Sequence, residues 1–210
     1  MRRLTLIGIL AAAFVACGGP PKTAPEPAEH SLATLAAQHI VILPTYAVKV
    51  VPGLTWGGIG RPSDLQKLLD ADIVSAFDER GLNKTWVFPP ELEHAYRQNP
   101  TYATDPYTLA EEPLRAPALE LETRLVEPFA TQVRRLVALH DDVRYVLAPV
   151  ELRLEKAGTG GRGVLRLVLL DARLSKVTWI GEFASDTLSA YSPAVTASIA
   201  SKFASAVATQ

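Results

Sequence analysis

The last third of the chain carries a pattern of apolar residues that strongly restricts the possible folds. Apolar side chains alternate with polar or smaller ones in three short runs between residues 150 and 183. The three runs are Val150, Leu152 and Leu154, then Leu165, Leu167 and Leu169, then Val177, Trp179 and Phe183. A period of two places alternate side chains on one face of a strand. We therefore expect an antiparallel meander of three strands with one face buried.

A glycine-rich stretch, GTGGRG at residues 158–163, separates the first two of these runs. Its spacing fits G-x-G-x-x-G, the loop that binds dinucleotide phosphates. Such a loop needs a helix after it, so that the phosphates meet free backbone N–H groups. Residues 164–170 alternate as a strand instead. We expect a loose hairpin connection in which the glycines adopt positive φ, with Arg162 in solvent and no nucleotide or other cofactor bound.

Helices and two short strands are expected around the meander. An apolar stripe from Leu65 to Phe77 predicts a helix that Ser63 caps, with Gln66 at the capping-box position. Further helices are expected from Pro89 to Arg97, over 118–140 with Pro128 kinking or splitting it, and from Ser192 to the C-terminus. Short strands are expected at 39–43 and 84–88, and 46–51 extends or pairs with the first. The order β-α-β-α-α-β-β-β-α indicates an α+β fold with a single mixed sheet and helices packed on it.

The N-terminus has the features of an exported protein. Arg2 and Arg3 precede a short apolar stretch, which is typical of a signal peptide. Residues 14–17, Phe-Val-Ala-Cys, resemble the lipobox of bacterial lipoproteins, and Cys17 is the only cysteine. We predict a lipoprotein signal peptide over 1–16, a lipidated Cys17 that begins a proline-rich tether over 17–29, and a single α+β domain over 30–210. Gly18 favours the outer membrane, facing the periplasm, by analogy with known lipoproteins.

Several phrases of the sequence resemble a group of bacterial envelope lipoprotein and secretion domains that includes CsgG, LpoB and the N-terminal domain of TolB. The phrases are Val-Ile-Leu-Pro at 41–44, the strand-like run 140–150, and the hairpin-like run 165–179. Thr45 stands where the group usually has phenylalanine, and Ser175 where it has a turn glycine. The resemblance implies a non-enzymatic domain that binds or assembles with other envelope proteins.

Candidate catalytic and metal-binding residues are few. Asp171 with Trp179 suggests a site, but an aspartate at that place also caps the turn over 172–176. Asp141–Asp142 suggests paired catalytic carboxylates or a solvated turn, and Glu111–Glu112 a contact surface within the proline-interrupted loop over 99–117. The chain has four histidines: His30, His39, His94 and His140. None of them has the i, i+4 spacing of a helical zinc site, and we predict no catalytic residues and no bound metal.

Aromatic residues in expected loops are better candidates for partner binding. Trp56 lies in the loop over 52–62, and Tyr102 and Tyr107 in the loop over 99–117. Aromatic side chains are enriched at interface hot spots, although such side chains also fold back over a core. The net charge is −1, and −3 without Arg2 and Arg3, so we expect no nucleic-acid partner.

We therefore expect a lipid-anchored envelope protein, an accessory or assembly factor that contacts the membrane through its anchor and an envelope protein through its loops. Two alternatives stay open. One is an envelope hydrolase acting on cell wall or sugar, which requires a cleft that gathers carboxylates such as Asp105, Glu111 and Asp171. The other is a small-ligand-binding transport auxiliary, which requires a sizeable apolar pocket.

Overall fold

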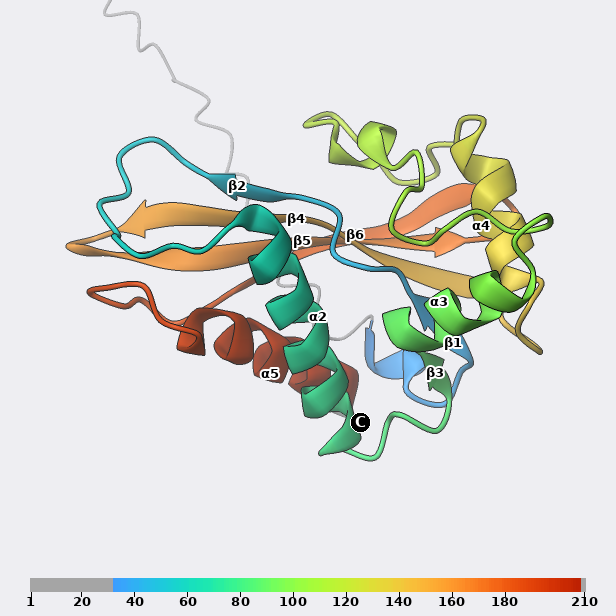
Figure 1. Ribbon diagram of the computed structural model, residues 1–210, viewed down its shortest axis with the longest axis horizontal. Coiled ribbons are helices and arrows are strands. Elements are labelled where there is room, and N and C mark those ends of the chain that lie inside the picture. Colours follow the sequence, from blue (N-terminus) through green and yellow to red (C-terminus); the bar gives the residue numbers. More distant parts are fainter. Residues whose placement is uncertain (1–31, 209–210) are drawn as a thin grey trace, which may run out of the picture.

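The computed structural model describes residues 32–208, in which six strands form one open mixed sheet and four α-helices pack against it (Figure 1). The strands are β1 (Ile40–Ile42), β2 (Val48–Val50), β3 (Trp86–Val87), β4 (Tyr145–Ala157), β5 (Gly160–Asp171) and β6 (Lys176–Ala184). The helices are α2 (Pro62–Asp78), α3 (Pro89–Gln98), α4 (Phe129–Val137) and α5 (Ala194–Ala208), with 3-10 turns η1 (Ala33–Leu35) and η2 (Glu112–Arg115). The expected α+β class is confirmed. The signal peptide, Cys17 and the tether lie outside the described residues, and among those residues no helix is long and apolar enough to cross a bilayer.

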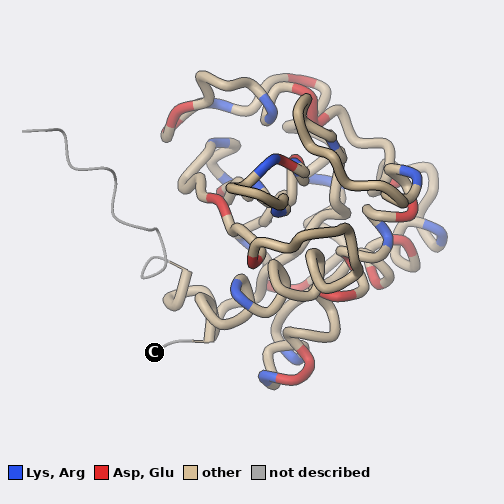
Figure 2. Tube along the Cα trace, turned by 90° about the vertical axis from the view of Figure 1, so that its left-hand side faces the viewer, with Lys and Arg blue, Asp and Glu red and all other residues tan. Residues whose placement is uncertain are grey.

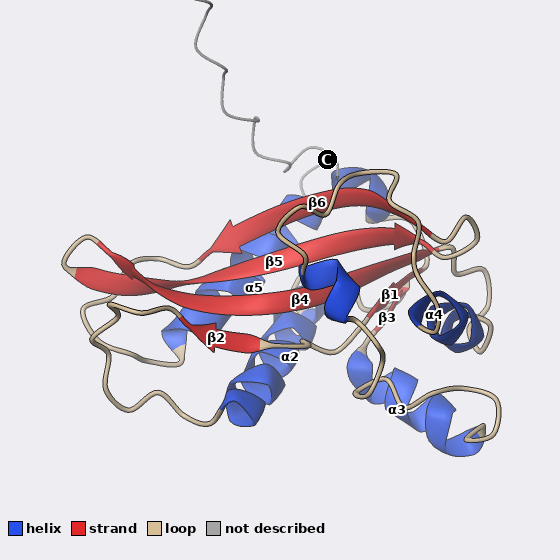
Figure 3. Cartoon of the chain, turned by 90° about the horizontal axis from the view of Figure 1, so that it is seen from above, coloured by secondary structure: helices blue, strands red, loops and turns tan. Residues whose placement is uncertain are grey.

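The three long strands form the predicted antiparallel meander, with β5 between β4 and β6. The sheet order is β3-β1-β4-β5-β6, and β1 runs parallel to both β3 and β4 (Figure 3). The segment after β1 continues along the same edge, because β2 pairs in parallel with β4 at Leu152 to Leu154. The N–H of Tyr46 donates to the carbonyl of Pro149 at 3.0 Å between these two pairings. Of the two expected arrangements, residues 46–51 extend the first strand along this edge and do not pair with it.

Two bulges change which residues share a face of the sheet. The register of β4 against β5 shifts between Pro149 and Glu151, which places Val150 on the opposite face from Leu152. The register of β5 against β6 shifts between Leu169 and Leu170, which separates Val177 from Trp179 in the same way. An extra residue in one strand reverses the alternation after it. The first and third predicted stripes are therefore divided between two faces, whereas Leu165, Leu167 and Leu169 lie on one face.

Both faces of the sheet carry a hydrophobic core, whereas the sequence predicted one buried face. Helices α2 and α5 cover one face, where Phe77 and Phe203 pack with ring centroids 5.0 Å apart. Helix α4 and the loop over 99–117 cover part of the other face, with Phe129 and Leu114 in that core. Figure 1 shows α2 and α5 below the sheet and α4 above it. The second core was missed because the loop over 99–117 has no helical or strand periodicity.

The helix expected over 118–140 is confined to α4, and its first part is irregular. The peptide bond between Glu127 and Pro128 is cis, and Pro128 is the residue that precedes the helix. Proline therefore begins this helix rather than kinking it. The predicted cap is also wrong for α2, because the helix begins at Pro62 after Arg61, and Ser63 makes no capping bond. Gln66, which we expected to complete a capping box, instead donates from its side chain to the carbonyl of Tyr46.

The glycine-rich stretch forms a tight hairpin rather than a loose connection. Ala157 pairs with Gly160, so the turn contains only Gly158 and Thr159, and within the stretch only Gly158 has a positive φ (57°). The later glycines are strand residues that allow close approach: a Cβ at Gly160 would lie 2.2 Å from the carbonyl oxygen of Leu188. Arg162 is not free in solvent, because its guanidinium contacts Glu155 at 2.8 Å.

Candidate functional site

Trp56 folds back over a core, which is one of the two alternatives left open for the aromatic residues in the expected loops. Its side chain is 8% exposed and belongs to the core beneath α2 and α5. The indole N–H donates to the carbonyl of Leu188 at 3.3 Å, and a Cβ on Gly161 would come within 2.8 Å of the ring. Trp56 therefore packs at the end of the core, directly over Gly161, where a larger residue would leave no room for the indole ring. A role of Trp56 in partner binding stays a prediction, and little of its side chain is accessible to a partner.

Tyr102 and Tyr107 are exposed as predicted, at 48% and 46%. The loop that carries them is nevertheless fixed, because Leu109 and Leu114 are each 2% exposed and lie in the second core. The N–H of Ala110 also donates to the Gln132 side chain at 2.9 Å. Anchored aromatic rings need less ordering on binding than rings on a flexible segment do.

Asp171 caps the turn that follows it, which is one of the two roles that the sequence predicts for this residue. Its carboxylate accepts the N–H of Leu174 at 2.9 Å and pairs with the Arg144 guanidinium at 2.6 Å. Burial acts to raise the pKa of Asp171, but these hydrogen bonds and the Arg144 charge outweigh it and hold the pKa below its usual value. Trp179 packs partly buried against the first core, and Asp141 and Asp142 lie exposed in the turn between α4 and β4.

The carboxylates that a hydrolase was expected to gather are not brought together. Asp105 accepts the N–H of Tyr107 at 2.9 Å in its own turn, and Asp171 faces Arg144. Glu111 borders a pocket between α2, α3 and the loop over 99–117, and neither Asp105 nor Asp171 lines that pocket. The hydrolase alternative required a cleft that gathers Asp105, Glu111 and Asp171, and that prediction is wrong.

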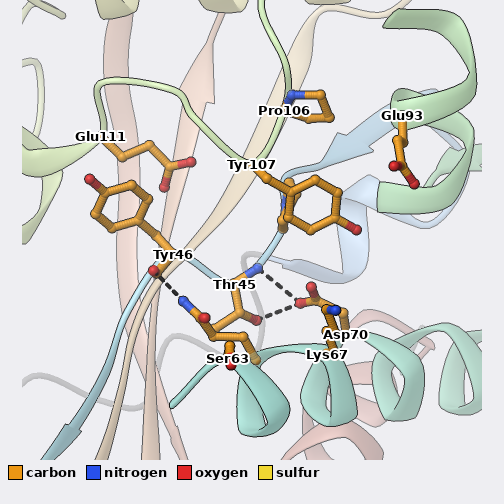
Figure 4. A pocket seen from close by; sticks show the side chains of 11 residues that line it. Thr45, Tyr46, Ser63, Lys67, Asp70, Glu93, Pro106, Tyr107 and Glu111 are labelled. Atoms are coloured by element: carbon orange, nitrogen blue, oxygen red, sulfur yellow. Dashed lines mark hydrogen bonds between the residues drawn. The ribbon is translucent and has the colours of Figure 1, made fainter. Parts of the chain in front are cut away.

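A pocket of about 450 Å³ lies between the β1–β2 segment, α2, α3 and the loop over 99–117 (Figure 4). This volume is in the range of small-ligand sites. Seven of its eleven lining residues have charged, aliphatic hydroxyl or amide side chains, although apolar atoms supply the larger part of its surface. The lining residues are Pro44, Thr45, Tyr46, Ser63, Gln66, Lys67, Asp70, Glu93, Pro106, Tyr107 and Glu111.

Helix α2 presents one polar stripe to this pocket. Ser63, Gln66, Lys67 and Asp70 recur at steps of three and one along the helix, which places them on one side. The buried apolar side chains of the same helix, such as Leu69 and Ile73, point toward the first core. Packing of the apolar side of α2 against the first core therefore fixes the position of the polar side chains that line the pocket.

Asp70 is held by Thr45, the residue at which the sequence departs from the group it resembles. Both the N–H and the hydroxyl of Thr45 donate to one Asp70 oxygen, at 2.9 and 2.6 Å. Burial raises the pKa of Asp70 to about 6, although both hydrogen bonds from Thr45 act to lower it. A carboxyl group that changes protonation near pH 6 inside a pocket is typical of functional sites, although structural pairs also shift pKa values.

Glu111 is the most unusual residue of the pocket. It is 1% exposed, and its Oε2 has no hydrogen-bond partner among the described residues. Its burial follows from the chain on either side, because Leu109 and Leu114 draw this segment into the second core. Burial raises the pKa of Glu111 well above its ordinary value, Glu112 and Asp70 raise it further, and Arg115 partly opposes them.

Tyr46 connects the pocket with the 3-10 turn η2. Its hydroxyl donates to Glu112 at 2.6 Å, and the Arg115 guanidinium lies 4.9 Å from its ring centroid. The bond to Glu112 is the main reason that the pKa of Tyr46 is raised. Tyr107 stands across the pocket from Tyr46, with Glu111 between and above them in Figure 4. The pocket thus has aromatic walls and acidic groups at both ends.

Sequence reasoning identified Tyr107 and Glu111 but missed the rest of this site. The polar stripe of α2 was a usable signal, because it ends in an acidic residue one turn beyond Lys67. Thr45 was noted only as a departure from a pattern. Their convergence depends on the path of the loop over 99–117 across the sheet, which the local sequence does not specify.

Charged residues of both signs are interspersed along the trace (Figure 2). Within residues 32–208, no group of three or more His, Cys, Asp or Glu side chains is placed to hold a metal ion.

No protein-family model and no curated protein sequence matches the chain. Among solved structures it is similar to two PelC dodecamers from Paraburkholderia phytofirmans. One, a variant, has 13% identity, coverage of 82% of this chain and 90% of that chain, and a TM-score of 0.39. The other has 14% identity, coverage of 83% of this chain and 90% of that chain, and a TM-score of 0.37. The C-terminal domain of LpoB from Salmonella enterica has 12% identity, coverage of 76% of this chain and 96% of that chain, and a TM-score of 0.37. LpoB belongs to the group that the sequence resembles, and neither CsgG nor TolB is among these three. At such TM-scores the similarities assign no function to this chain.

Proposed function

We propose that the chain is a lipid-anchored protein of the bacterial envelope that works by binding a partner and carries out no catalysis itself. The anchor rests on the lipobox-like residues 14–17. The observation that carries partner binding is the pair of half-exposed rings, Tyr102 and Tyr107, on a loop fixed by buried residues. Tyrosine is enriched at interface hot spots, and Tyr107 also borders the pocket.

Several contacts favour binding over hydrolysis. Of the three carboxyl groups in the pocket, Asp70 is held by Thr45 and Glu93 is ion-paired with Arg97 at 2.5 Å, which leaves only Glu111 without a partner among the described residues. Asp171, the third member of the expected hydrolytic set, is occupied by Arg144. An acid and a base acting on one bond must both face the substrate. The arrangement supports a protein that recognises a partner or ligand.

A second function, ligand binding, is favoured by the volume of the pocket, about 450 Å³. Its charged side chains distinguish it from the site of a carrier for apolar compounds; they are Lys67, Asp70, Glu93 and Glu111. A ligand for this pocket would be held by charge and hydrogen bonds, with Tyr46 and Tyr107 as walls. Partner binding and ligand binding are compatible if the partner inserts a side chain.

The anchor is tested by growing cells with a labelled fatty acid and isolating the full-length chain. We expect the label on the wild-type protein and none on Cys17→Ala, whereas Gly18→Ala, which retains the acceptor, is labelled. Absence of label from the wild-type chain would contradict the anchor. Crosslinking in intact cells tests the partner: we expect one envelope protein recovered repeatedly with the wild type, and recovery of none would contradict partner binding.

A further inference from the structure

The unpaired Glu111 carboxyl group indicates what the pocket lacks. Burying a carboxyl group without a hydrogen-bond partner is costly, and Glu111 Oε2 has no partner among the described residues. Figure 4 shows the Glu111 side chain extending from the loop toward the middle of the pocket. A group that recognises a ligand is expected to be polar, buried at a cavity and without a hydrogen-bond partner in the protein itself. Glu111 has these three properties.

The charges around Glu111 are mainly negative. Asp70 and Glu93 also line the pocket, and Glu112 lies beside Glu111. Two cations face this set. Lys67 is exposed on α2, and Arg115 on η2 has its guanidinium over the Tyr46 ring. The Nε of Arg115 is itself buried without a partner, and Arg115 makes no ion pair within 4.0 Å in the part of the chain described. Arg97 pairs with Glu93, so when all of these groups are ionised the four carboxylates exceed the three cations by one charge.

The walls of the pocket favour an organic cation over a bare ion. Tyr107 and Tyr46 offer aromatic faces, and Pro44 and Pro106 add apolar surface. Aromatic faces attract ammonium and guanidinium groups, and Arg115 already uses the Tyr46 ring in this way at 4.9 Å. A volume of about 450 Å³ also exceeds by far the space of one water-sized ion, about 30 Å³.

We propose that this pocket is a binding site for an organic ammonium group, which pairs with Glu111 while the apolar part of the ligand packs against Tyr107 and Tyr46. The ammonium group belongs either to a free amine or to a lysine side chain of the partner. The proposal goes beyond partner binding and does not depend on the lipid anchor. Purified protein suffices to test it, so its failure is distinguishable from the absence of a crosslinked partner in cells.

Proton release accompanies binding at this site. In the empty pocket the pKa of Glu111 is raised by burial, by Glu112 and by Asp70, against the lowering effect of Arg115. Tyr46, Tyr107, Lys67 and Glu93 complete the titratable surroundings. An ammonium group favours the ionised carboxylate, so Glu111 loses its proton when the ligand binds. Affinity therefore rises with pH until the empty-pocket carboxyl is already ionised.

The direct test is calorimetric titration of the full chain with phenethylammonium, and with uncharged phenethyl alcohol as the matched comparison. We expect saturable binding of the amine only. Glu111→Gln removes the charge at constant shape and weakens binding about tenfold to a hundredfold, as for a hydrogen bond to a charged group. The control Glu120→Gln makes the same change at an exposed residue between η2 and α4 that does not line the pocket, and it leaves the affinity unchanged.

A second variant acts in the opposite direction and does not disturb the core. Lys67→Gln removes an exposed competing ammonium group and is expected to tighten amine binding severalfold. Titration in two buffers of different ionisation enthalpy measures proton release on the wild-type chain, without any substitution. A capped lysine peptide and its acetyl-lysine counterpart separate the two sources of the ammonium group. Tighter binding of the lysine peptide than of phenethylammonium indicates a partner side chain, and the reverse indicates a free amine.

Four results would overturn the proposal. The first is that no amine binds saturably at any pH between 5 and 9. The second is that the alcohol binds as tightly as the amine. The third is that Glu111→Gln, verified as folded, binds the amine as the wild type does. Binding of a divalent metal ion without binding of the amine would overturn it as well.

Discussion

Replacing Asp70 by asparagine is expected to stabilise the chain, by an amount that grows with pH. Asp70 lies in the wall of the pocket, and burial raises its pKa from 3.8 to about 6. Asparagine has nearly the same shape and keeps an oxygen that can accept the two hydrogen bonds from Thr45. The substitution therefore removes the charge and leaves the contacts in place.

The magnitude follows from the two pKa values. The folded chain keeps this proton up to about pH 6, whereas the unfolded chain loses it near 3.8. Between these values the folded state binds more protons, so stability contributed by this group is present at low pH and declines as pH rises through the window. A tenfold difference in proton affinity corresponds to about 1.4 kcal/mol, so the full effect is about 3 kcal/mol. Asp70 also raises the pKa of Glu111, and relieving that repulsion acts in the same direction.

The assay is urea unfolding of the wild type and Asp70→Asn at pH 4, 5, 6 and 7. The quantity of interest is the difference in free energy of unfolding between the two proteins at each pH, because contributions of the other carboxyl groups largely cancel. We expect this difference to increase by about 2–3 kcal/mol in favour of Asp70→Asn from pH 4 to pH 7. A difference that stays constant, or that increases in favour of the wild type, would refute the assigned protonation of Asp70.

Three further substitutions test the fold around the site. Gly160→Ala places a Cβ 2.2 Å from the Leu188 carbonyl oxygen, so we expect a loss of about 1–3 kcal/mol in urea unfolding, whereas Gly57→Ala, with nothing within 4 Å, has little effect. Asp171→Asn removes a carboxylate whose pKa is held low, so its destabilisation is largest at neutral pH and shrinks as pH falls through the acid range; a pH-independent loss would argue against this. Trp56→Ala is expected to lower the free energy of unfolding by about 3–5 kcal/mol, as for other buried aromatic residues, whereas Tyr102→Ala lowers it only slightly. Equal losses in the two variants would contradict the difference in burial between these side chains.

The meander and the principal helices could be predicted because their apolar periodicity is local. Leu165, Leu167 and Leu169 lie on one face as predicted. The face of Val150 could not be predicted, because the bulge between Pro149 and Glu151 depends on pairing with β5. The glycines at 160–163 were interpreted as turn residues, although their role is to admit residues from distant segments, such as Trp56 and Leu188. Sequence spacing alone does not distinguish these two uses of glycine.

The candidate site was predictable only in pieces. Tyr107 and Glu111 attracted attention through residue type and loop position, and Asp171 through a local turn that the structure confirms. The pocket itself depends on contacts between residues more than 20 positions apart, such as Thr45 with Asp70. Hydrogen bonds of this kind are specified by the packed fold and leave no periodic signal in the chain.

Site-specific photocrosslinking in intact cells tests partner binding most directly. A photoreactive amino acid replaces Tyr102 or Tyr107 in turn, and the control position is Glu79, which is exposed at the end of α2. Partner binding through the loop over 99–117 predicts that one envelope protein is crosslinked from both tyrosine positions and not from Glu79. Equal crosslinking from all three positions, or none from the tyrosines while the protein remains folded and exported, would contradict it.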